Sequence, residues 1–545
     1  MRKCFTFFLM FFVFACTVFA QPRANTATQK PALVVGLVID QMRWDYLYRF
    51  EKLYGPDGFK RLLTQGFSFD NTLIPYTPTY TAAGHTCVYT GSVPAIHGIV
   101  GNDWFEKSIN AGMYCTSDST VSGVGSNSAA GKMSPKNMWT TSVTDELRLS
   151  NNFKSKVIGI SLKDRGAILP AGHSANAAYW YDDGVGKFIS SSFYMKELPT
   201  WVNSFNAKEL PSKYMGIDWN LLKDKGAYTQ AANDENGYET AVPGEKTVSF
   251  PHKLSQLTTT KLTALRYTPH GSTYSFDFAK AAIENEQLGK GNATDFLALS
   301  ISSTDYIGHN FGPNSLEIED TYARLDKDIA DFLKWLDLRL GKGNYLLFLT
   351  ADHAAAHVPA FLKEHNLPGG LYDDYTMLRE INTALDSIYG IKGIIKRSYN
   401  YQFYLNHALI AQSGRSADSI KSSIVKLLKD YPAVMYAFET EKMAGTTINE
   451  TQKQMMSNGF NHQRSGDIMF TVKPNYFDHG PKGTTHGAWN PYDSHIPLLW
   501  FGWNIKPGAT NREVHMTDIA PTVAAMLKIQ MPSGNVGKPL LELVK

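Results

Sequence analysis

Three short apolar segments of this chain each run into a turn that carries an aspartate, and this repeated pattern constrains the fold most strongly. The segments are ALVVGLVI before Asp40, FLALSI before Asp305 and YLLFL before Asp352. Apolar runs of this length, rich in branched side chains, are typical of strands buried on both faces of a parallel sheet. Ligands bind at the carboxyl ends of such strands, so these distant residues are expected to meet at one edge.

A helix is predicted between the second and third of these strands. In residues 315–340 the apolar side chains recur at steps of three and four, Ser315 can cap the first turn, and Gly341 follows the last one. A strand, a helix and a strand in one sheet form a right-handed crossover with both strand ends on the same edge. Asp305 and Asp352 are therefore predicted to share a crevice.

Further elements fit the same α/β class. Residues 157–160 (VIGI) read as a strand that leads to Lys163 and Arg165, residues 496–501 (IPLLWF) as another, and residues 517–527 as a helix with Pro521 in its first turn. We interpret the chain after residue 20 as a single catalytic domain, 21–545. Two stretches without a strong strand rhythm, about 169–294 and 359–474, are predicted to be insertions that cap its core.

The N-terminus predicts export. Arg2 and Lys3 precede an apolar stretch, and Val18-Phe19-Ala20 resembles a processing site, so residues 1–20 read as a signal peptide. The alternatives are an uncleaved anchor and a lipoprotein signal with Cys16 as the modified residue. Later segments are too short or too polar to span a bilayer, so no stable membrane insertion is expected after cleavage. The mature protein is expected in the periplasm or the medium.

Charge and cysteine content exclude other classes of partner and scaffold. Of 545 residues 43% are hydrophobic, and loss of residues 1–20 would lower the formal charge from +3 to +1. A near-neutral chain without a basic run argues against a nucleic-acid partner. Cys87 and Cys115 would remain after cleavage; an exported compartment permits a disulfide between them but does not require one.

Six residues have the types and spacings that zinc sites use. Asp305 and His309 are four apart, so one helical turn places both on one face. The other four are Asp40, His486 in the segment GTTHG, and the adjacent Asp352 and His353. Any one of these residues is more often a turn, cap or surface residue than a ligand. Together they suffice for two ions with three protein ligands each.

The same residues, in the same order, resemble the ligand pattern of the alkaline phosphatase superfamily. The segments VIDQMRWDYLYRF, GSVPAIHGIVGNDWF, SLKDRGAILPAGH, STDYIGHNFGPNS and GTTHGAWNPYDSHIPLLW are similar to the PafA-type bacterial zinc alkaline phosphatases. The resemblance extends from about residue 31 to the C-terminus. It implies a three-layer α/β sandwich with a mostly parallel central sheet, helices on both faces and cap insertions.

The resemblance also implies roles. Thr81 would be the nucleophile, since its spacing to Asn102 matches the family and that of Thr77 and Thr79 does not. Asn102, Lys163 and Arg165 would bind phosphate. Without the resemblance, Asn102 would be interpreted as a helix cap and the two cations as solvated surface charges. The implied zinc ligands are Asp305, His309 and His486 for one ion, and Asp40, Asp352, His353 and Thr81 for the other.

The implied activity is hydrolysis of small phosphate monoesters through a phosphothreonine intermediate. A monoester carries two negative charges, which the two cations Lys163 and Arg165 would neutralise. The alternative is a nucleotide pyrophosphatase or phosphodiesterase, a branch of the same superfamily that lacks such a pair. A sulfatase is excluded, because Tyr89 and Gly91 stand where sulfatases have proline and arginine after the cysteine. A non-catalytic binding protein should have lost a ligand, and none is missing. Ala354 replaces a glycine expected from the family.

Overall fold

A computed structural model of the protein describes residues 30–478 and 480–544. The predicted signal peptide, residues 1–20, and Cys16 lie outside the described residues. Within the described part, every helix is too short or too polar to cross a bilayer. Residues from Pro31 onward form one unit by their contacts.

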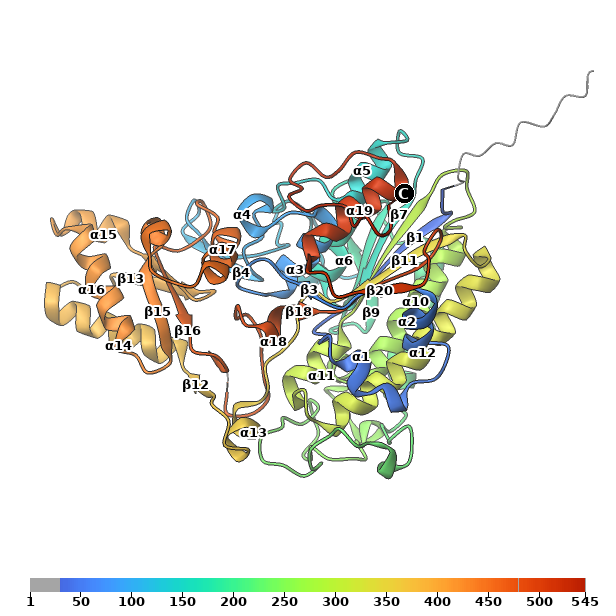
Figure 1. Cartoon of the computed structure of the whole chain (residues 1–545), viewed down its shortest axis with the longest axis horizontal. Coiled ribbons are helices and arrows are strands. Elements are labelled where there is room, and N and C mark those ends of the chain that lie inside the picture. The colour runs from blue at the N-terminus through green and yellow to red at the C-terminus, as the bar shows by residue number, and fades with distance from the viewer. Residues whose placement is uncertain (1–29, 479, 545) are drawn as a thin grey trace, which may run out of the picture. The chain divides into compact units, whose positions relative to one another are not determined.

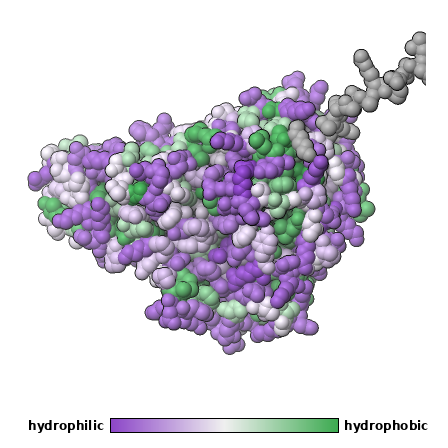
Figure 2. Space-filling model, in the orientation of Figure 1, coloured by the Kyte–Doolittle hydropathy of each residue, from purple (hydrophilic) through white to green (hydrophobic). Residues whose placement is uncertain are grey.

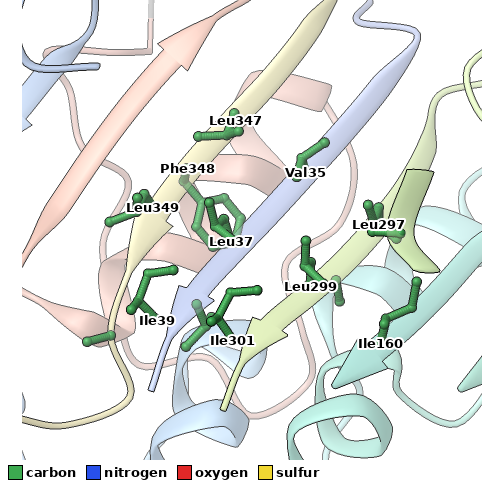
Figure 3. Close-up of a cluster of buried hydrophobic side chains, with 14 of the residues drawn as sticks. Val35, Leu37, Ile39, Ile160, Leu297, Leu299, Ile301, Leu347, Phe348 and Leu349 are labelled. Carbon is green, nitrogen blue, oxygen red and sulfur yellow. The ribbon is translucent and has the colours of Figure 1, made fainter. Parts of the chain in front are cut away.

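A ten-stranded sheet forms the centre of this unit, and β1 (Leu33–Ile39) lies in its middle. It pairs in parallel with β10 (Asp295–Ile301) on one side and β11 (Tyr345–Thr350) on the other. Every residue of the three strands is buried, and Figure 3 shows their apolar side chains packed over the sheet. The carboxyl ends of all three strands meet at one edge, as the sequence predicted, with β1 between β10 and β11.

The sheet continues beyond these strands on both sides. β7 (Val157–Ser161), predicted from VIGI, pairs in parallel with β10, and β8 (Ala177–Asp182) pairs in parallel with β7. β19 (Leu498–Gly502) runs antiparallel to β11. The remaining strands of the sheet are β2 (Phe67–Phe69), β6 (Gly123–Val124), β9 (Lys187–Ser191) and β20 (Gly508–Thr510). The predicted α/β class with a mostly parallel central sheet is confirmed.

The predicted strand at residues 496–501 is divided at Pro497. Its first part, β18 (His495–Ile496), pairs with β3 (Thr72–Leu73) in a small separate sheet, and its second part is β19. Proline has no N–H to donate, so a central strand cannot pass through it unbroken.

Helices cover both faces of the central sheet (Figure 1). α2 (Phe59–Gln65), α10 (Pro269–Asn285) and α12 (Leu316–Leu340) lie on one face. α3 (Thr81–Thr90), α5 (Val143–Leu149), α6 (Asp164–Ala171) and α19 (Ile519–Leu527) lie on the other. α12 is the predicted helix: the Ser315 hydroxyl accepts from the backbone N–H of Ile318, and Gly341 follows its last turn.

The segment predicted as a second insertion, 359–474, has a sheet and a core of its own. β13 (Ile395–Tyr399), β14 (Gln402–Leu405), β16 (Ile468–Val472) and β15 (Val434–Glu439) pair in that order. Helices α14 (Asp374–Tyr389) and α16 (Ala417–Lys429) pack on them around a separate apolar cluster. The other predicted insertion, 169–294, contributes β8 and β9 to the central sheet and α10 to its face.

The apolar residues are concentrated in these cores. The larger cluster surrounds the central sheet, and the smaller one fills the 359–474 segment. Figure 2 shows mainly hydrophilic residues on the visible face, with hydrophobic residues scattered among them.

Candidate metal centre and nucleophile

Three buried aspartates meet at the carboxyl edge of the central strands. Asp40 follows β1 directly, Asp352 follows β11, and Asp305 lies in the first turn of α11 (Ser303–Phe311), just after β10. Gln41 links two of them: its side-chain amide donates to Asp305 Oδ1 at 2.6 Å and its backbone N–H to Asp352 Oδ1 at 3.2 Å. Gln41 has a positive φ of 65°, so the chain reverses here after Asp40.

Two compact groups of ligand atoms form around these carboxylates. Asp40, Asp352 and His353 make one group, and Asp305, His353 and His486 make the other, with the ligand atoms of each within 4.8 Å of one another. His353 belongs to both, and its ring stacks on that of His486 with centroids 3.4 Å apart. The first group contains three of the four residues expected at one ion, Thr81 being the fourth. In the second, His353 stands where the sequence predicted His309.

His309 nevertheless lies beside the second group. Its Nε2 is 3.2 Å from Asp305 Oδ1, one helical turn away on α11, as the i, i+4 spacing predicted. His486 Nε2 is 3.9 Å from the same oxygen. All six predicted ligand residues are therefore brought to one edge of the sheet.

Backbone carbonyls orient the three imidazoles. Nδ1 of His309 contacts Thr484 O at 2.7 Å, Nδ1 of His353 contacts Ala354 O at 3.0 Å, and Nδ1 of His486 contacts Thr79 O at 2.6 Å. A carbonyl can only accept, so each Nδ1 carries the hydrogen and each Nε2 offers its lone pair. Burial and the rings of His353 and His309 lower the pKa of His486, which favours the neutral form that binds metals.

The carboxylates leave room for cations. Asp40 Oδ1 and Asp352 Oδ2 are buried and have no hydrogen-bond partner in the described part of the chain. Burial, then the charge of Asp352, raises the pKa of Asp40 well above its usual value. Oxygens and imidazole nitrogens in this arrangement form a donor set suited to zinc. The residues present therefore fit a metal centre.

Thr81 lies between these groups at the first position of α3. The Thr81 hydroxyl is 3.3 Å from His353 Nε2, and the residue is 1% exposed. The backbone N–H of Ala82 donates to Asn102 Oδ1 at 3.0 Å, so Asn102 lies against the same helix start. His85, one turn further, holds the other side of the site, with Nδ1 3.2 Å from Asp352 Oδ2.

The two predicted cations start α6. Lys163 precedes its first residue, and its ammonium donates to Asp40 Oδ2 at 2.7 Å and to Asp305 Oδ2 at 2.5 Å. It thus joins the two ligand groups and is almost fully buried. Arg165 donates to the Tyr114 hydroxyl at 3.2 Å, while its buried Nε has no partner within the described residues.

The structure also shows the state of the two cysteines, Cys87 and Cys115, and the backbone conformation of Ala354. Cys87 and Cys115 are both buried free thiols. Ala354 is not among the described residues with positive φ, so alanine is not strained in this position. Its N–H donates to Asp493 O at 2.9 Å.

Other histidines have structural contacts. His357 Nδ1 contacts the Asn314 side chain, and His495 stacks on Trp44. Gln41 was not predicted as a site residue, although it stands directly after Asp40 in the sequence.

Gly84 permits the close approach of α3 to the metal edge. A Cβ at Gly84 would lie 2.3 Å from the Asp352 carbonyl oxygen, a backbone atom that cannot move alone. Gly84→Ala is therefore expected to separate Thr81 from Asp352 and to lower the free energy of unfolding by about 2 kcal/mol or more. Urea denaturation and zinc titration would measure both effects. Gly445→Ala, where a Cβ meets nothing within 4 Å, is the control, and equal behaviour of the two variants would contradict the packing argument.

Comparisons with known proteins agree with this geometry. The family described as type I phosphodiesterase / nucleotide pyrophosphatase matches residues 34–493. Alkaline phosphatase PhoV of Synechococcus elongatus is 52% identical over 95% of this chain and 93% of its own length. Alkaline phosphatase PafA of Elizabethkingia meningoseptica is 49% identical over 95% of this chain and 96% of its own.

The solved structures give the same result. A crystal structure of wild-type PafA matches with a TM-score of 0.93 at 49% identity, covering 95% of this chain and 99% of that one. A PafA variant with one threonine, one asparagine, one lysine and one arginine substituted matches with a TM-score of 0.92, with the same identity and coverage. The chain therefore belongs to the type I phosphodiesterase / nucleotide pyrophosphatase family of the alkaline phosphatase superfamily, and within that superfamily it resembles the PafA and PhoV alkaline phosphatases.

Proposed function

We propose that this protein is an exported alkaline phosphatase that hydrolyses small phosphate monoesters in the periplasm, with two zinc ions and Thr81 as the nucleophile. One observation carries the proposal: a buried threonine hydroxyl lies against two groups of zinc-type ligands, and the Lys163 ammonium bonds to a carboxylate of each group. Two relatives, PhoV at 52% identity and PafA at 49%, bear the name alkaline phosphatase, which supports the reaction class.

The proposed ligands follow the sequence prediction. One ion would take Asp305, His309 and His486, and the other Asp40, Asp352, His353 and the Thr81 oxygen. When bound, zinc would lower the pKa of the threonine hydroxyl and balance negative charge on the reacting oxygens. His353 belongs to both groups, but its single Nε2 lone pair could coordinate only one of the two ions.

Thr81 would attack phosphorus as the ester P–O bond breaks and the alcohol leaves, which forms a phosphothreonine; water would then release inorganic phosphate and restore the Thr81 hydroxyl. Its position at the start of a ten-residue helix places the phosphoryl group at an end that favours anions. Because Asn102 Oδ1 accepts from Ala82 N–H, the amide orientation leaves the Nδ2 hydrogens as donors for a phosphate oxygen. The PafA variant has substitutions of the same four types, in the same order, as Thr81, Asn102, Lys163 and Arg165.

The cationic pair favours monoesters over diesters. A monoester carries two negative charges on its non-bridging oxygens, whereas a diester carries one and a second bulky group. Lys163 would contribute a point charge, and Arg165 a planar fork able to bind two oxygens at once. The alternative, a nucleotide pyrophosphatase or phosphodiesterase, agrees with the family description but gives the pair no role.

The proposed catalytic domain comprises residues 21–545, and residues 359–474 with their separate core would act as a cap. Nucleic acid is not among the proposed partners, because the chain is near neutral.

Removal and return of metal test the proposed function. Chelation is expected to abolish hydrolysis of a simple aryl phosphate monoester, because the proposed zinc ions would lower the pKa of the Thr81 hydroxyl and balance the negative charge of the phosphate. Two equivalents of zinc, counted by elemental analysis, should restore it. A diester with the same leaving group should react more slowly. Full zinc occupancy without monoester hydrolysis, or faster diester hydrolysis, would refute the assignment.

A further inference from the structure

Asn102 lies in a short loop, residues 98–103, that is bonded to the 359–474 segment. Directly before the loop, α4 (Pro94–His97) lies beside α17 (Glu450–Gly459), which belongs to that segment (Figure 1). We call residues 98–103 the Asn102 loop. The 359–474 segment supplies none of the predicted site residues, but it contacts the loop that carries one of them.

Arg464 holds the first residue of the Asn102 loop. Its Nη1 donates to Gly98 O at 2.6 Å and to Asn137 O at 2.7 Å. Its guanidinium carbon lies 4.7 Å from the ring centroid of Trp104 and 4.2 Å from that of Trp139. A guanidinium over indole rings is stabilised by its charge, and its planar shape keeps the donors in fixed directions. Arg464 is therefore a rigid donor at this end of the loop.

The buried charge of Arg464 has no hydrogen-bonded counter-ion in the described part of the chain. The residue is 5% exposed, its Nε lacks a hydrogen-bond partner there, and the Glu106 carboxylate is 3.8 Å from that Nε. Burying a charge without a bonded counter-ion costs free energy. The contacts that offset this cost are the bonds to carbonyls, and these fix the backbone of the loop.

Asn400 holds the last residue of the Asn102 loop, because its Nδ2 donates to Asp103 O at 2.8 Å. Asn400 and Tyr401 have positive φ, 57° and 61°, in the tight turn between β13 and β14. Asparagine is favoured in turns of this kind. A Cβ at Gly101 would lie 2.6 Å from Asn400 Nδ2, so the glycine lets this turn approach the loop.

Between these two anchors, Asn102 accepts two bonds from the rest of the protein. Its carbonyl accepts from Cys115 N–H at 2.9 Å, and its Oδ1 accepts from Ala82 N–H at 3.0 Å. Its Nδ2 is the donor proposed for phosphate. Such a donor contributes fully only where it is held at the position of the substrate oxygen. A shift of the loop at either end would therefore move the proposed phosphate donor.

We propose that Arg464 is a positioning residue for phosphate binding: it holds the Asn102 loop so that the Asn102 amide reaches the phosphate, while Asn400 holds the other end. This role rests on the proposed function, in which Asn102 binds phosphate. Through it the 359–474 segment would take part in substrate binding without touching the substrate.

A double-mutant cycle on the zinc-loaded protein tests this role, with calorimetric binding of inorganic phosphate as the readout. Arg464→Met removes the donors and keeps an unbranched side chain against the tryptophans. It is expected to weaken phosphate binding about tenfold, within the value of one hydrogen bond to a charged group, at unchanged zinc content. In an Asn102→Ala background the same substitution should weaken binding less than about twofold, because the group through which Arg464 acts is absent.

Lys396→Met is the matched control, because Lys396 is another cation of the 359–474 segment but bonds to Asn110, outside the loop. It should keep phosphate affinity within about twofold, as substitutions away from a site usually do. If Arg464→Met fails to fold, Asn400→Gly provides the same comparison, since glycine keeps the positive φ and removes the side-chain bond.

No loss of affinity in the wild-type background, or equal fold losses in both backgrounds, would overturn the positioning role. A loss in Lys396→Met as large as in Arg464→Met would overturn it as well. These results would leave the proposed function intact. Asn102→Ala with unchanged phosphate affinity would instead refute the role of Asn102 in the proposed function, and the role of Arg464 with it.

Discussion

Thr81→Ala is expected to abolish turnover of phosphate monoesters while the metal stays bound. The Thr81 hydroxyl is the one that lies at the first position of α3 and 3.3 Å from His353 Nε2, whereas the six other proposed ligands remain in the variant. Loss of a nucleophile that acts together with its activating group typically costs a thousandfold or more in kcat, about 4 kcal/mol. Steady-state kinetics and zinc analysis on the same sample would measure both quantities.

Two further variants make this test specific. Thr81→Ser keeps a hydroxyl and should retain measurable turnover with a phosphorylated residue detectable after acid quenching. Thr77→Ala removes a nearby hydroxyl whose contact is a long one, 3.5 Å to Gly487 O, and should keep kcat within a few fold. Full activity in Thr81→Ala, or loss of activity in Thr77→Ala alone, would show that Thr81 is not the nucleophile.

The central strands were predictable because their side chains are buried on both faces. β1 is apolar throughout, β10 and β11 are mainly apolar, and burial on both faces favours that composition whatever surrounds them. The helix between β10 and β11 was predictable for a related reason: one face of α12 is apolar, and its Ser315 cap is local. From these elements the meeting of Asp305 and Asp352 follows by topology alone.

Other features depend on contacts that no local pattern encodes. Gln41 links Asp305 to Asp352 only because the chain turns with positive φ after β1, and polar residues of this type follow many strands. The place of His353 between both ligand groups arises from its stacking on His486, more than a hundred residues away. β8 and β9 were missed because aromatic and polar residues interrupt their apolar pattern.

Arg165→Ala and Lys163→Ala are expected to lower kcat/KM for monoesters much more than for diesters. A hydrogen bond to a charged group contributes about 1.5–3 kcal/mol, so the loss of a bidentate arginine should cost monoesters about 100-fold. A diester with one charge gains less from the fork and should lose about tenfold less. Rates for both substrate types on each variant give the comparison without correction for the amount of active enzyme.

The two variants should differ in the melting temperature of the metal-free protein, which separates a role in substrate binding from a role in stability. Lys163 bonds to Asp40 and Asp305, so Lys163→Ala leaves two buried carboxylates without their cation and should lower the melting temperature of the metal-free protein. Arg165→Ala should not, since Arg165 donates to the neutral hydroxyl of Tyr114. Arg266→Ala, which removes a part-buried guanidinium bonded to Tyr181 O and paired with Asp183 at 3.5 Å, is the control for loss of a cation that contacts no ligand carboxylate. Equal losses for monoesters and diesters would show that the cations do not set specificity, and the phosphodiesterase alternative would then be preferred.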